Sequence, residues 1–154
     1  LPRLIENPES PNLRDQMSEC SLLAGLCISH TRTAICHSIS YPLTAHYDVP
    51  HGLACAFTML EVLKVNIDKD DGRFDKLAIE LMGPNNNAQN LPEFFKDFCD
   101  GLGIAEKIKT YVSSLESIIR LIPEMYTKQR ADNCLTPIDF GDIESIIKKS
   151  FIDN

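Results

Sequence analysis

The chain has no tryptophan, and only 15 of its 154 residues are lysine or arginine, against 22 aspartate or glutamate. The basic residues are scattered, and the net charge is −7. Nucleic acids and anionic membrane surfaces both bind to protein faces on which basic residues are clustered, so neither is expected as a partner. No apolar run approaches the roughly 20 residues that a membrane-spanning helix needs. The composition is therefore that of a globular protein with a small-molecule or protein ligand.

The sequence also lacks a CxxC pair, although it contains six cysteines. Four of them lie inside apolar helical patterns, so we expect reduced, mostly buried thiols that behave as small hydrophobic residues. This usage indicates the cytoplasm. The first residues have neither an initiator methionine nor the apolar core of a signal peptide. We therefore expect the chain to begin within a longer protein.

Helical periodicity covers most of the sequence, and no alternating run of strand length occurs. We expect helices at about 11–29, 32–45, 51–66, 70–81 and 91–102, short helices at 105–111 and within 114–131, and a last helix at 139–151. The run at 20–29 is apolar nearly all round, which predicts a helix buried on most sides. The fold class is all-α: a compact bundle of about seven or eight helices, with 1–154 forming a single helical metal-binding domain.

Three of the four histidines, His37, His46 and His51, lie within fifteen residues that also contain Pro42 and Pro50. Imidazole is the commonest protein metal ligand. His37 lies in one arm of a predicted helical hairpin, and His51 lies at the entry to the other. The spacing alone is a weak metal signal, and the alternative is that one histidine packs while the others are solvated. Whether the rings converge depends on the helix near Pro42, which is expected to kink or to end its regular part there.

The stretch from His37 to Ala56 reads H-x(4)-P-L-x(6)-P-H-G-x-A-x-A. This pattern resembles the helical C-terminal domain of the iron-containing alcohol dehydrogenases. The resemblance implies that His37 and His51 are two metal ligands. It also implies two further ligands, an aspartate and a histidine, on an upstream helix, and an N-terminal α/β domain that binds NAD or NADP. The upstream helix and the α/β domain are not part of this chain, which alone would be incomplete and inactive.

The chemistry that the resemblance implies is hydride transfer between a nicotinamide and the carbonyl carbon of a small alcohol–aldehyde pair. A divalent metal would act as a Lewis acid on the substrate oxygen. The family favours Fe²⁺, while the ligand types also suit Zn²⁺. Dimers are common in the family, and the sequence is compatible with a homodimer.

Two further residues are candidates for the site. Tyr41 stands where many members of the family carry another histidine. It could donate a hydrogen bond as a catalytic group, or it could be a packing aromatic. Arg32 precedes the motif within Thr-Arg-Thr, in a context that resembles a branch including phosphonoacetaldehyde reductases. Its guanidinium could bind a carboxylate or phosphonate of the substrate, or pair with a surface acid. His46 is expected to be a solvated or backbone-bonded loop residue, and Cys134 a buried structural thiol.

Three functions remain open from the sequence. The leading one is the metal-binding catalytic domain of an iron-type alcohol dehydrogenase. The second is a helical interaction module that has lost catalysis. The third is a zinc-dependent enzyme of the related glycerol dehydrogenase or dehydroquinate synthase branches. An upstream Gly-rich nucleotide loop and an Asp-x(3)-His pair would separate them.

Overall fold

The computed structural model describes residues 1–152 and contains helices but no strand within that range. Eight of the helices have seven or more residues. Both observations confirm the predicted all-α fold. The chain divides into two compact units, Leu1–Thr33 and Ala34–Asn154.

The first unit consists of α1 (Pro2–Glu6) and α2 (Pro11–Thr31). Arg14 ties the start of α2 to the preceding turn, because its Nε donates to the carbonyl oxygen of Pro8 at 2.6 Å. No residue of α2 is buried, and the side chains of Leu22 and Leu23 are 64% and 55% exposed. The prediction of a helix buried on most sides is therefore wrong for this structure. The physical reason is that a pair of helices cannot enclose a helix that is apolar all round.

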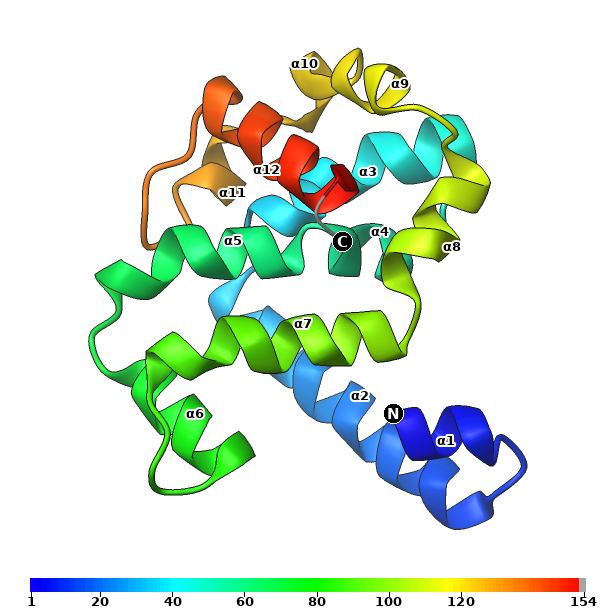
Figure 1. The fold of residues 1–154 in the computed structure, drawn as a ribbon, viewed down its shortest axis with the longest axis vertical. Coiled ribbons are helices and arrows are strands. Elements are labelled where there is room, and N and C mark those ends of the chain that lie inside the picture. The colour runs from blue at the N-terminus through cyan, green and yellow to red at the C-terminus, as the bar shows by residue number, and fades with distance from the viewer. Residues whose placement is uncertain (153–154) are drawn as a thin grey trace. The chain divides into compact units, whose positions relative to one another are not determined.

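The second unit holds the remaining helices (Figure 1). They are α3 (Ile35–Tyr47), α4 (His51–Phe57), α5 (Met59–Asn66), η1 (Ile67–Lys69), α6 (Arg73–Met82), η2 (Ala88–Asn90), α7 (Leu91–Gly101), α8 (Ile104–Tyr111), α9 (Leu115–Ile119), α10 (Ile122–Met125), α11 (Lys128–Ala131) and α12 (Phe140–Ile152). The helix expected over 51–66 is interrupted at Thr58, where ψ is 0°. None of the helices in residues 1–152 combines the length and apolarity of a membrane span.

The main core of this unit lies between α3 and the C-terminal helices. Ile35, Ile39 and Leu43 recur every fourth residue on α3, so they share one face, and all are fully buried. The stripe predicted for α12 packs into the same cluster, with Ile143, Ile146 and Ile147 buried and Phe151 partly buried. The buried face of α3 fixes which of its residues point away from the core, and therefore where the histidines can lie.

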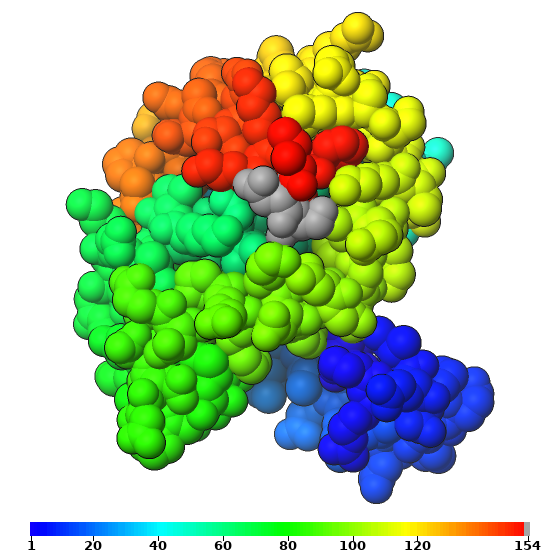
Figure 2. Space-filling view, in the orientation of Figure 1, coloured from blue at the N-terminus to red at the C-terminus, as the bar shows by residue number. Residues whose placement is uncertain are grey.

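A smaller cluster joins α6, η2 and the start of α7, built on Ala78, Ala88 and Leu91. The carboxylate of Asp70 begins α6 by accepting the backbone N–H groups of Gly72 and Phe74 at 2.9 and 2.7 Å. This is the role of a helix-start residue, as the sequence indicates. Figure 2 shows that side chains close the space between α5 and α7 that the ribbon leaves open.

Candidate functional site: a histidine–cysteine cluster at the α3–α4 hairpin

A tight turn brings α3 and α4 together. Asp48 ends α3 in the left-handed region, with φ 55° and ψ 24°, a conformation that aspartate tolerates better than most residues. The Thr44 hydroxyl donates to the carbonyl oxygen of Val49 at 2.9 Å, and the Val49 side chain is fully buried. Pro50 then precedes the first residue of α4, His51. The hairpin predicted from the sequence is therefore anchored at its turn by hydrogen bonds and by a buried side chain.

The rings of His37 and His51 converge across this hairpin. Their centroids lie 5.3 Å apart with an angle of 64° between the planes. Helix α3 does not end at Pro42, which is buried, but continues to Tyr47. The sequence left open whether the rings of His37 and His51 converge, and the continuous helix past Pro42 brings them together.

A third donor, Cys55, joins the two histidines. Its Sγ lies 3.7 Å from Nε2 of His51, and the donor atoms of the three residues all lie within 4.8 Å of one another. His51 and Cys55 are four residues apart on α4 and so share one face. The sequence analysis missed Cys55, although the His-x(3)-Cys spacing at the start of a predicted helix was a signal for it.

Ser40 fixes the protonation pattern of His51. Its side chain is fully buried, and its hydroxyl donates its single hydrogen to the carbonyl oxygen of His37 at 2.9 Å. Ser40 Oγ is therefore left to accept from Nδ1–H of His51, 3.3 Å away. In that tautomer Nε2 carries the lone pair, on the side of the ring that contacts Cys55. A histidine whose far nitrogen is held in this way is prepared to bind a metal through the near one.

Tyr41 covers the other side of His51. The two rings are stacked, with centroids 5.6 Å apart and planes 12° apart. The guanidinium carbon of Arg130 lies 4.8 Å from the centre of the Tyr41 ring, and its Nη2 donates to the Tyr41 hydroxyl at 3.2 Å. Arg130 comes from α11, 89 residues along the chain, and the sequence gave no sign that it belongs to the site.

The electrostatics of the cluster favour neutral imidazole. Burial lowers the pKa of His37 below its ordinary value, and the neighbouring His51 and Arg130 lower it further. Neutral imidazole is the form that binds a metal ion. Burial raises the pKa of the Cys55 thiol.

The remaining sequence candidates lie elsewhere. His46 Nε2 contacts Glu124 Oε2 at 2.8 Å on the surface and is not part of the cluster; the residue belongs to α3 and not to a loop. Arg32 belongs to the first unit, where it ends α2 with φ 65°. Cys134 is half-buried against the main core, and its Sγ donates to the carbonyl oxygen of Arg130 at 3.7 Å.

The cysteines are less buried than predicted. All six are free, but only Cys99 is buried, while Cys20 and Cys27 on α2 are exposed. The expectation of mostly buried thiols is wrong because no residue of α2 is buried and because Cys36, Cys55 and Cys134 are only partly buried.

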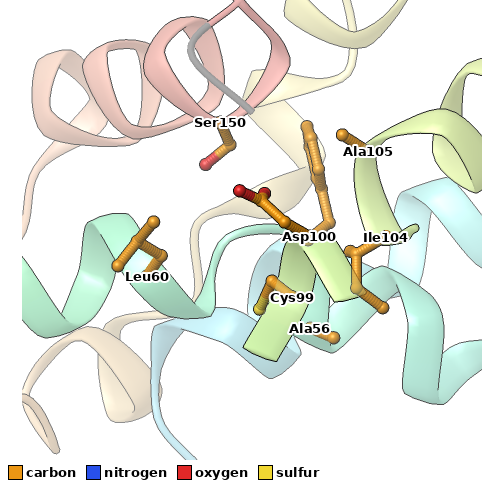
Figure 3. A pocket seen from close by; sticks show the side chains of 8 residues that line it. Ala56, Leu60, Cys99, Asp100, Ile104, Ala105 and Ser150 are labelled. Atoms are coloured by element: carbon orange, nitrogen blue, oxygen red, sulfur yellow. The ribbon is translucent and has the colours of Figure 1, made fainter. Parts of the chain in front are cut away.

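An enclosed pocket also lies in the second unit, between α4, α5, α7, α8 and α12 (Figure 3). Its volume is about 10 Å³, and Ala56, Leu60, Cys99 and Ile104 are among the residues that line it. A space of this size holds one water molecule at most. It is a packing defect of the core and not a substrate site.

Comparison of the sequence with known proteins identifies a family. The family described as "Fe-containing alcohol dehydrogenase family, C-terminal" matches residues 1–151. The chain therefore belongs to the iron-containing alcohol dehydrogenases, as their C-terminal part. No solved structure matches it at a significant level.

The curated relatives include dehydrogenases of several alcohols. An alcohol dehydrogenase of Thermococcus barophilus is 28% identical over 99% of this chain and 40% of its own length. A 1,3-propanediol dehydrogenase of Klebsiella pneumoniae is 35% identical over 47% of this chain and 18% of its own length. An NADPH-dependent butanol dehydrogenase of Clostridium saccharobutylicum is 31% identical over 64% of this chain and 26% of its own length. The chain thus spans at most 40% of these three relatives.

Proposed function

We propose that this chain supplies the C-terminal half of the metal centre in an NAD(P)-dependent alcohol dehydrogenase that interconverts a small alcohol and its aldehyde. The observation that carries the proposal is the convergence of His37 and His51, at 5.3 Å between ring centroids, inside the motif of the family. Membership of the family adds the reaction class. The six free thiols support the cytoplasmic location that the sequence predicts.

The donor set fits a divalent transition metal. Nε2 of His51 carries a lone pair because Ser40 holds Nδ1, and His37 is neutral because its pKa is lowered. Fe²⁺ and Zn²⁺ are both bound by imidazole. When bound, such an ion supplies a Lewis acid that polarises a substrate oxygen.

The two histidines are half of the ligand set that the resemblance implies. The other half, an aspartate and a histidine, would come from an upstream segment that also carries the nucleotide-binding domain. The longer relatives are consistent with this arrangement, because each extends well beyond the region that this chain matches. We therefore assign the chain's partner as its own upstream nucleotide-binding domain.

Tyr41 is assigned a role beside the reacting atoms. Its hydroxyl accepts from Arg130, which leaves the phenolic hydrogen able to donate toward the open side of His51. A tyrosine there can donate a hydrogen bond to a substrate oxygen. Tyrosine is a much weaker acid than histidine, so a tyrosine at this position relays protons less readily at neutral pH than the histidine common in the family.

Arg32 is proposed to bind an anionic group of the substrate, such as a carboxylate or phosphonate. The proposal rests on the Thr-Arg-Thr context and on the bidentate geometry of guanidinium. In a longer polypeptide that includes the nucleotide-binding domain, replacing Arg32 by glutamine should raise KM for an aldehyde with an anionic group at least tenfold and leave KM for a neutral aldehyde unchanged. An equal effect on both substrates would contradict the assignment.

Metal titration tests the proposed centre. Zn²⁺, and Fe²⁺ without oxygen, would be titrated calorimetrically into this chain and into a longer polypeptide that includes an upstream nucleotide-binding domain. We expect binding that is weak in the chain, tight in the longer polypeptide and lost in His37→Ala and His51→Ala. The matched control is His46→Ala, which removes a histidine of the same hairpin that lies outside the cluster.

Two results would contradict the proposal. One is a longer polypeptide that binds neither ion. The other is binding that survives both His37→Ala and His51→Ala. Either would make the helical interaction module the better description of the chain.

A further inference from the structure

We propose that Cys55 is a third protein ligand of this centre, and that its sulfur makes the centre prefer Zn²⁺ to Fe²⁺. The inference rests on the proposed function, because it takes His37 and His51 as the first two ligands. Cys55 lies outside the family motif's metal positions. The contacts described above place Cys55 beside His37 and His51.

The distance between His51 and Cys55 is the one that a shared ion requires. Zinc–nitrogen bonds of about 2.0–2.1 Å and zinc–sulfur bonds of about 2.3 Å, at a tetrahedral angle, put the two donors about 3.6 Å apart. The observed separation of His51 Nε2 and Cys55 Sγ is 3.7 Å. These two donors can therefore bind one ion without moving.

The position of His37 is compatible with the same ion. All three donor atoms lie within 4.8 Å of one another. At a tetrahedral angle, two donors of one zinc ion lie about 3.3–3.6 Å apart. The widest separation in the cluster therefore has to contract by up to about 1.2–1.5 Å, which requires rotation of the His37 and Cys55 side chains. Since His37 and Cys55 are only partly buried, the neighbouring atoms do not block such rotations on every side.

Ser40 is the residue that prepares the pair. By donating to the carbonyl oxygen of His37 and accepting from Nδ1 of His51, it turns the lone pair of His51 Nε2 toward the side of Cys55. A fully buried hydroxyl holds this arrangement before any ion arrives. In the alternative without a metal, the Cys55 thiol donates a weak hydrogen bond to Nε2 of His51. The same two atoms are then in contact, but no ion is bound.

The chemistry of sulfur sets the metal preference. Thiolate is a soft ligand that favours Zn²⁺, whereas carboxylate and imidazole sets with open positions are typical of non-haem Fe²⁺. Two imidazoles and one thiolate form a three-donor set on this chain, to which the upstream ligands of the proposed function would be added. Within residues 1–152, no carboxylate belongs to the cluster.

Cobalt is the probe for the test, because Co²⁺ replaces Zn²⁺ and a cobalt–thiolate bond gives a charge-transfer band in the near ultraviolet. Co²⁺ would be titrated without oxygen into the chain, into Cys55→Ser and Cys55→Ala, and into the control Cys134→Ser, which removes another partly buried thiol of the same unit. Zn²⁺ affinity would be measured by competition. Circular dichroism would verify that each variant is folded.

We expect the charge-transfer band in the chain and in Cys134→Ser, and its loss in both Cys55 variants. Zn²⁺ affinity should fall at least about tenfold in those variants, since even the loss of an outer-shell partner costs about 10–100-fold. Fe²⁺ affinity should change less. Bound Zn²⁺ should also protect Cys55, identified by mass spectrometry, from alkylation.

Two outcomes overturn the inference in distinguishable ways. If Co²⁺ and Zn²⁺ bind with no charge-transfer band and with equal affinity in the Cys55 variants, Cys55 is not a ligand. In that case the two-histidine centre stands. If the ions bind neither this chain nor the longer polypeptide, or bind equally after His37→Ala and His51→Ala, the proposed function itself fails and this inference fails with it.

Discussion

The phenol ring of Tyr41 lies almost parallel to the imidazole of His51, with 5.6 Å between ring centroids and 12° between planes. Tyr41 is on α3 and His51 begins α4, so the stack links the two arms of the hairpin. His51 is an exposed residue. An exposed ring keeps one orientation only when neighbours hold it, and Tyr41 and Ser40 hold this one from two directions.

Removal of the stack should therefore weaken metal binding. For Tyr41→Ala we expect Zn²⁺ affinity to fall about tenfold, the lower end of the cost of losing an outer-shell partner. Tyr41→Phe keeps the ring and removes only the hydroxyl bonded to Arg130. Its affinity should stay within about threefold of the unmodified chain. Competition titration measures both, and equal affinities for the alanine and phenylalanine variants would refute a role for the stack.

Acid should destabilise the metal-free chain through His37. The pKa of His37 in the folded state lies below its ordinary value of 6.5, because of burial, His51 and Arg130. As the pH falls below 6.5, His37 is protonated in the unfolded chain while it is still neutral in the folded chain. The unfolded state therefore binds more protons, and the free energy of unfolding decreases on acidification. The free energy of unfolding should decrease more steeply for the unmodified chain than for His37→Gln. Denaturant titrations at several pH values test this.

Arg130 supplies part of that shift. Arg130→Gln removes a positive charge near His37, so the pKa of His37 should rise toward its ordinary value. Histidine titration by NMR measures the change. The control is Arg120→Gln, a charge removal on the same unit at a residue that does not affect the pKa of His37. A pKa that moves equally in both variants, or falls in Arg130→Gln, would be evidence against the assignment.

The ion pair of His46 with Glu124 should matter little. The two side chains are 45% and 56% exposed, and surface pairs contribute about 0–1 kcal/mol. We expect His46→Ala to lower the free energy of unfolding by less than about 1 kcal/mol. Metal affinity should not change. A loss of binding comparable to that of His51→Ala would place His46 in the site after all.

The core contribution of α12 can be tested within one helix. Ile147 is fully buried, whereas Ile152 is 66% exposed. Ile147→Ala should cost about 2–5 kcal/mol of unfolding free energy, because it leaves a cavity in the main core. Ile152→Ala should stay within about 0.5 kcal/mol. Thermal or denaturant unfolding of the two variants measures the difference, and similar costs would contradict the packing of α12.

The sequence by itself determined the helical class, most helix positions and the two histidines. Ile143, Ile146 and Ile147 recur at helical spacing, and spacing along one helix fixes which residues share a face. The motif that includes His37 and His51 is local, since it lies within the twenty consecutive residues 37–56. Both patterns can be recognised in the sequence because they depend only on the geometry of a single helix or turn.

Only the tertiary structure decided what the helices bury and what surrounds the histidines. The apolar run of α2 looked buried, but burial depends on a covering partner, and none of its residues is buried here. Arg130 reaches Tyr41 from 89 residues away, a contact that no local pattern encodes. The orientation of His51 likewise depends on the Ser40 hydroxyl, which donates to the carbonyl oxygen of His37 and accepts from Nδ1 of His51. Local spacing identified the candidate site residues, and long-range packing decided which of those side chains contact one another.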